Sequence, residues 1–233
     1  AAGQNIGDAR QRAEVRHEVL AAQALLLHPE RDGVEGLHRA SLLVLAGGPA
    51  LLWQTTDQGR ALTAESARRL AAVSRGTPVS PFTLETMSGA TARAPGQGKV
   101  AIVEFIYTSC PTICQSAGAD MRQLADRVRA AGLSDRVALY SVSFDPGFDT
   151  VDKLADYGER HDADGALWTI TRPQESVLPR LLDEFGIIVL PDRMGGYTHN
   201  VAVHVVGPDG RIGGIHDTGD FDGALATAAR LLR

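Results

Sequence analysis

The chain has 233 residues, 44% of them hydrophobic and 22% charged, a balance that is ordinary for a globular protein. This length predicts one full domain plus a smaller segment. The net charge of −5 and the lack of a dense Lys/Arg cluster argue against a nucleic-acid-binding surface, so we expect no nucleic acid among the partners.

The first part of the chain, residues 1–76, is predicted to be an α-helical N-terminal extension. A polar helix is expected at about 9–27, where Ala, Arg and Glu are frequent. A short amphipathic helix is expected at 64–73, with Thr63 as its N-cap.

Within this extension, residues 41–53 form an apolar stretch preceded by Arg39. A basic residue before a short apolar run is typical of a signal-peptide core or a membrane anchor. The stretch is short for a spanning helix, which needs about 20 residues, and Gly47-Gly48-Pro49 is expected to break it. A buried helix followed by a turn fits the same pattern.

Strands and helices alternate over residues 77–233. The predicted strands are 82–84, 100–107, 137–144, 167–171, 200–206 and 211–215. The predicted helices are 111–131, 150–161, 175–185 and 221–232. Pro208-Asp209-Gly210 predicts a hairpin between the last two strands. This order predicts an α/β domain with a central mixed sheet and helices on both faces.

The only two cysteines, Cys110 and Cys114, follow the strand predicted at 100–107 and open the next helix. Unpaired N–H groups and the helix dipole at such a position lower the pKa of a thiol. The thiolate is both the nucleophile of redox chemistry and a ligand for soft metals. A structural disulfide and two inert buried thiols are the other interpretations.

The spacing of the two cysteines favours a metal ion. Residues four apart on a helix have Cβ atoms about 5–6 Å apart, whereas a disulfide needs about 3.5–4.5 Å. Two thiolates on one metal ion can stand roughly 4 Å apart. A disulfide between Cys110 and Cys114 therefore needs a distorted first turn and should be easily reduced.

A copper site would add an imidazole to two thiolates. His199 is the strongest candidate, because it follows the glycine-containing loop 193–198 and precedes a predicted strand. A surface histidine fits the same position. His161 is expected to end a helix as a positive charge on the helix dipole, while His204 and His216 are expected to be packed or at the surface.

Three segments resemble the Sco/SenC family of thioredoxin-fold copper chaperones, which serve cytochrome c oxidase assembly. They are Phe105–Cys114, Ser141–Pro146 with Asp149-Thr150, and His199 ahead of Val205–Gly210, and they occur in the family's order. The resemblance runs from about Pro81 to the C-terminus. It implies a thioredoxin-like fold for 77–233.

The resemblance also implies a copper ion, Cu(I) or Cu(II), bound by Cys110, Cys114 and His199. The implied partner is a copper-accepting oxidase subunit or another copper chaperone. The implied location is outside the cytoplasm, periplasmic or anchored facing the periplasm, with 41–53 as the anchor.

The segment around His199 departs from the family pattern. The family often has Asp before and Ser after this histidine, where Thr198 and Asn200 stand here. Asp145 resembles a family aspartate near the site, and we expect it to orient the imidazole or balance its charge.

Two functions follow from these residues. A metallochaperone would hold copper and pass it on by ligand exchange, without catalysing a reaction. A thiol–disulfide oxidoreductase would instead use Cys110 and Cys114 as a redox-active pair that reduces the cysteines of a partner. A peroxidase, which needs only one activated cysteine, is a more distant third.

Overall fold

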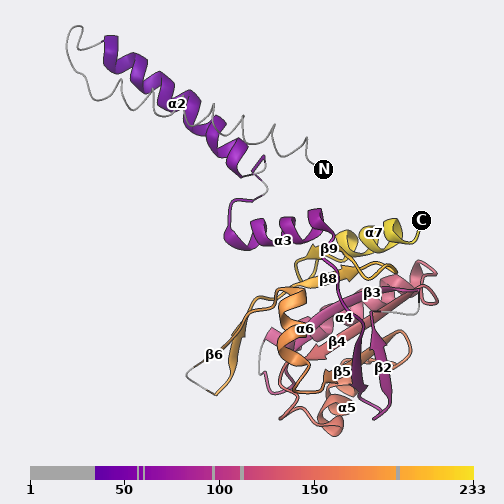
Figure 1. Cartoon of the computed structure of the whole chain (residues 1–233). Coiled ribbons are helices and arrows are strands. Elements are labelled where there is room, and N and C mark those ends of the chain that lie inside the picture. The colour runs from indigo at the N-terminus through magenta and orange to yellow at the C-terminus, as the bar shows by residue number, and fades with distance from the viewer. Residues whose placement is uncertain (1–34, 57, 60, 96–97, 111–112, 193–194) are drawn as a thin grey trace. The chain divides into compact units, whose positions relative to one another are not determined.

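The computed structural model describes residues 35–233, apart from 57, 60, 96–97, 111–112 and 193–194 (Figure 1). Within helices, the side chains of 35–40, 42–43, 46 and 113–115 also lie outside the described part. The helix predicted at 9–27 lies outside it too. The chain divides into two units, Ala1–Arg68 and Arg69–Arg233, and each is described by itself.

In the first unit, helix α2 spans Glu35–Thr55 and continues through Pro49. The predicted break at this proline is therefore wrong. A proline inside a helix removes the bond to the carbonyl four residues earlier. That carbonyl belongs to Leu45, which is 70% exposed, so water can take the place of the missing N–H. Across the described residues, no helix combines the length and hydropathy needed to cross a membrane.

Helix α3, Ala64–Arg75, begins where the sequence predicts. The Thr63 hydroxyl accepts a hydrogen bond from the Ser66 N–H at 3.0 Å, which confirms Thr63 as the N-cap.

The second unit is built on a mixed sheet. Its strands are β1 Phe82–Thr86, β2 Thr91–Ala94, β3 Val100–Ile106, β4 Val137–Ser143, β5 Trp168–Pro173, β8 Val203–Val206 and β9 Ile212–His216. Their order across the sheet is β2-β1-β5-β4-β3-β8-β9. The three central strands β3, β4 and β5 are parallel, and the outer strands pair antiparallel. Strand β3 is buried along its whole length, as a central parallel strand should be.

Helices cover both faces of this sheet (Figure 1). They are α4 Ile113–Ala130, α5 Val151–Arg160, α6 Leu178–Phe185 and α7 Phe221–Leu231. Successive residues of β3 point to opposite faces. Glu104 faces α4 and α7, beside Asp120 and Ala224, whereas Phe105 faces α6 and packs against Phe185 with ring centroids 5.1 Å apart. The predicted thioredoxin-like α/β architecture is confirmed.

A separate two-stranded sheet, β6 Val189–Pro191 with β7 Tyr197–His199, forms a hairpin that extends from the main sheet in Figure 1. The sequence analysis predicted neither of these strands, nor β2. Each is only three or four residues long, too short to show an alternation of apolar and polar residues.

Candidate metal-binding site

Cys110 lies just beyond the carboxyl end of β3, in the turn that leads to α4. Its side chain is buried, with 6% exposed, and its N–H donates to the Tyr107 carbonyl at 3.3 Å. We call residues 107–110 the cysteine turn. Cys114 lies in the first turn of α4, and its side chain is outside the described part. The prediction that the pair follows a strand and opens the next helix is confirmed.

The neighbouring parallel strand β4 ends at the same edge. Ser143 pairs with Ile106, so the next residues, Phe144 and Tyr107, lie side by side with ring centroids 5.2 Å apart. The carboxyl ends of parallel strands are the usual place for a binding site in an α/β sheet.

His199 reaches this edge from the hairpin. It is the last residue of β7 and pairs with Val189, so it ends a strand, whereas the sequence analysis placed it in a loop before one. The reason is the short β6–β7 ladder, which extends the backbone just ahead of residue 200. The imidazole packs against Phe144 with ring centroids 4.8 Å apart.

The chemistry of this imidazole suits a metal ligand. Burial lowers the pKa of His199, so the ring is held in its neutral form. Its Nδ1 atom is buried and has no hydrogen-bond partner among the described residues. A neutral imidazole with an unused nitrogen is the form that binds metals.

An aromatic cluster of Tyr107, Phe144 and Tyr197 joins the cysteine turn to the hairpin. The rings of Tyr107 and Tyr197 lie 5.3 Å apart, and the Tyr197 N–H donates to the Tyr107 hydroxyl at 3.4 Å. The cluster thus links the turn that carries Cys110 to the strand that carries His199. Among the described side chains, no three of the types His, Cys, Asp and Glu form a group that could hold a metal ion, and the Cys114 side chain is not among those described.

Asp145 follows β4 at the same edge. Its N–H donates to the Ser143 hydroxyl at 3.0 Å, and its carbonyl accepts the N–H groups of Phe148 and Asp149. Burial, followed by the nearby Asp149, raises the pKa of its carboxyl. No hydrogen bond between described residues joins Asp145 to His199.

Asp149 is the acidic residue that contacts the cysteine turn, and the sequence analysis gave it no role. It is fully buried, and its carboxylate accepts hydrogen bonds from the Thr108 N–H at 3.1 Å, the Thr108 hydroxyl at 2.5 Å and the Ser143 hydroxyl at 2.5 Å. Its presence in the segment 141–150 was the available signal. The spacing alone could not show that the chain after β4 folds back onto the turn after β3.

The remaining histidines in the second unit contact other groups of the domain. His161 caps α5, and burial, followed by the charges of Arg160 and Arg122, lowers its pKa. The positive charge expected on the helix dipole is therefore disfavoured, because the ring lies against Gly118 of α4 and away from water. His204 packs between aromatic rings and His216 bonds Asp220, both as expected.

Comparison with known proteins gives three kinds of similarity. The family model described as SCO1/SenC matches residues 72–231. A curated relative, the SCO1 protein homolog of Bacillus subtilis, is 28% identical over 138 residues, which are 58% of this chain and 70% of the relative.

Two solved structures share the fold. A SCO1/SenC family lipoprotein from Bacillus anthracis superposes with a TM-score of 0.62 at 18% identity, covering 68% of this chain and 96% of that one. ScoI from Bradyrhizobium japonicum, solved with copper bound, superposes with a TM-score of 0.55 at 21% identity, covering 66% and 99%.

Proposed function

Because the chain belongs to the SCO1/SenC family, we propose that it binds copper and delivers it to the copper site of a respiratory oxidase. The proposed ligands are Cys110, Cys114 and His199. The copper-bound Bradyrhizobium ScoI, whose fold this chain shares, supports the choice of metal.

The observation that carries the proposal is the buried Nδ1 of His199, without a hydrogen-bond partner among the described residues, at the sheet edge where Cys110 lies. A buried polar atom without a partner costs on the order of 1–3 kcal/mol. A metal ion coordinated by the Nδ1 atom of His199 at this edge would offset that cost.

The ligand set suits both oxidation states of copper. Two thiolates are soft ligands that favour Cu(I), and a neutral imidazole extends the set to Cu(II). Since burial lowers the pKa of His199, protons compete less with the metal for the imidazole. Phe144 and Tyr197 pack around this edge and limit the access of water.

Transfer to a partner would proceed by exchange of these ligands, with no substrate bond broken. The recipient we propose is a copper-accepting oxidase subunit or another copper chaperone. The lipoprotein relative from Bacillus anthracis supports an exported protein, periplasmic or anchored facing the periplasm. In this proposal 77–233 is the copper-binding domain and 1–76 the extension, with 41–53 as signal or anchor.

Copper titration of the reduced full-length chain tests the ligands. The wild type should bind one Cu(II) with a thiolate-to-copper absorption band, and Cys110→Ser or Cys114→Ser should abolish that band. His199→Ala should weaken Cu(II) binding by at least about 100-fold, since it removes a direct ligand. His216→Ala is the matched control, because His216 is already bonded to Asp220 and Thr227.

Unchanged Cu(II) affinity in His199→Ala would remove the third ligand from the proposal. A thiol–disulfide oxidoreductase would behave differently. Its reduction of a partner disulfide would need both cysteines and would be indifferent to His199→Ala and to copper.

A further inference from the structure

We propose that Asp149 is a positioning residue for Cys110, acting through Thr108. The idea rests on the proposed copper site, because it assigns Asp149 the task of holding one of that site's ligands in place. It adds a residue that is not itself a ligand.

The contacts of Asp149 are those of a fixed acceptor. Its side chain has no exposed surface, and three donors from two residues, Thr108 and Ser143, fill its two oxygens. Hydrogen bonds to a carboxylate are short and strong, and burial away from water strengthens them further. Both oxygens already accept hydrogen bonds from the cysteine turn or from the end of β4, so the role we assign to Asp149 is to hold the turn.

Thr108 lies inside the cysteine turn, which the Cys110 N–H closes onto the Tyr107 carbonyl. The Asp149 carboxylate accepts hydrogen bonds from both the backbone N–H and the side-chain hydroxyl of Thr108. Two bonds to one residue fix its orientation as well as its position. Only Ser109 lies between Thr108 and Cys110, so holding Thr108 in place restricts where the Cys110 sulfur can lie.

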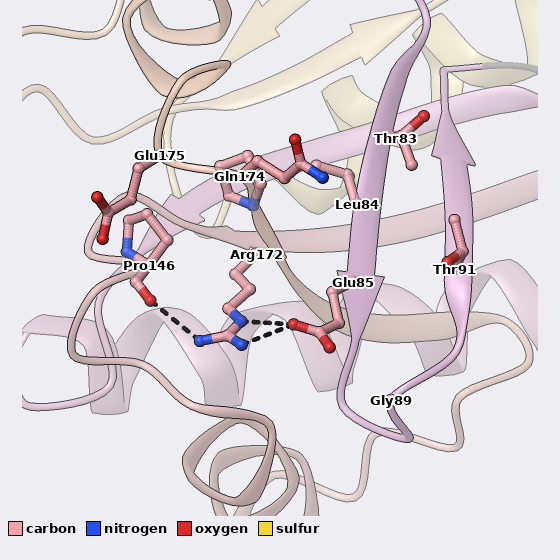
Figure 2. Close-up of a pocket in the computed structure, with 10 residues that line it drawn as sticks. Thr83, Leu84, Glu85, Gly89, Thr91, Pro146, Arg172, Gln174 and Glu175 are labelled. Carbon is pink, nitrogen blue, oxygen red and sulfur yellow. Dashed lines mark hydrogen bonds and ion pairs between the residues drawn. The ribbon is translucent and has the colours of Figure 1, made fainter.

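The backbone of Asp149 is itself held by hydrogen bonds on both of its polar groups. Its N–H donates to the Asp145 carbonyl at 2.9 Å, and its own carbonyl accepts from the Arg172 guanidinium at 3.0 Å. Arg172 also donates to the Pro146 carbonyl at 3.0 Å and to Glu85 of β1 at 2.8 Å, as Figure 2 shows. A continuous set of polar contacts therefore runs from β1 through the loop after β4 to the cysteine turn.

The test compares Asp149→Asn with Asp164→Asn in the full-length chain. Asp164 is the control, because its carboxylate is also held by several donors: the N–H groups of residues 166–168 at 3.0, 2.9 and 3.1 Å, and the Arg129 guanidinium at 2.8 Å. It precedes β5 and so lies at the opposite end of the parallel strands from the cysteine turn. Both variants should lose stability, but only one should disturb the site.

Three readouts separate positioning from stability. Asp149→Asn should shift the thiolate-to-Cu(II) absorption band, speed the loss of copper to a chelator about tenfold, and change the rate at which iodoacetamide alkylates Cys110 at one fixed pH. Asp164→Asn should match the wild type in all three. Equal behaviour of the two folded variants would overturn the inference.

A second pair of variants covers the case in which Asp149→Asn does not fold. Thr108→Val removes the hydroxyl donor and should reproduce part of each change, whereas Thr108→Ser keeps it and should restore wild-type values. Val and Ser variants that behave alike would also overturn the inference. Should the wild type bind no copper, the proposed function fails, and the alkylation rates alone still decide the role of Asp149.

Discussion

Two carboxyl groups in the second unit, those of Glu104 and Asp149, are buried and are accommodated in different ways. Glu104, in the middle of β3, accepts one hydrogen bond, from the Ser141 hydroxyl, which itself accepts the Trp168 indole N–H. Asp149, at the carboxyl edge, accepts three. Burial raises the pKa of Glu104 to about 8, so that it is neutral at pH 7.

The two acids are buried to nearly the same depth and differ in the number of donors that surround them. Glu104 has one donor and is accommodated in the core by keeping its proton. Asp149 has enough donors to act as a fixed acceptor, and these donors come from the turn that carries Cys110. Substitution of Asp149 should therefore lower the free energy of unfolding, whereas substitution of Glu104 should change how that free energy depends on pH.

The largest effect is expected from Asp149→Ala. It leaves the Thr108 and Ser143 donors buried without their acceptor, which should lower the free energy of unfolding by about 3 kcal/mol. Chemical denaturation of the reduced, metal-free protein measures this loss. A loss below about 1 kcal/mol would mean that water replaces the carboxylate, and the contrast with Glu104 would fail.

Glu104→Gln should change the pH dependence of stability. The folded state keeps the Glu104 proton up to about pH 8, whereas the unfolded chain loses it near its ordinary pKa of 4.5. This stabilising contribution is thus fully present below pH 4.5 and is lost as the pH rises towards 8.

The Gln variant, which has no proton to lose, should therefore gain on the wild type by on the order of 1–3 kcal/mol between pH 5 and 8. Urea unfolding at the two pH values measures the difference. Parallel pH profiles for the two proteins would show that Glu104 titrates as an ordinary acid.

The smallest effect is expected at His161, a buried base whose Nε2 has no hydrogen-bond partner among the described residues. Burial, with Arg160 and Arg122 nearby, lowers its pKa. Its contribution to stability is therefore present above its ordinary pKa of 6.5 and is lost as the pH falls below that value.

The test compares Glu104→Gln with the double variant Glu104→Gln/His161→Gln. Between pH 7.5 and 5.5 the free energy of unfolding of the single variant should fall by a few tenths of a kcal/mol through protonation of His161, and the double variant should not show this part of the loss. Thermal unfolding at the two pH values measures this. An identical loss in both proteins would assign it to another group.

The site could be predicted from the sequence only in part. Cys110 and Cys114 stood out because a buried apolar run, a cysteine pair and a helical pattern are continuous in the chain. His199 was found as a candidate, but its strand was not, because β7 exists only through its pairing with β6. Asp149 was missed as a contact of the turn, since its donors lie 41 and 6 residues away.

Local patterns in the sequence thus determined which segments became the long strands and helices, where α3 begins, and that Cys110 follows a strand while Cys114 lies in the first turn of a helix. Hydrophobic periodicity and helix capping involve residues that are close in the chain, so they can be recognised in the sequence. The tertiary structure decided the rest: that α2 runs through Pro49, that burial lowers the pKa of His161, and that Asp149 accepts hydrogen bonds from the cysteine turn. Burial and hydrogen bonding between distant segments set these outcomes, and they arise only when the chain has folded.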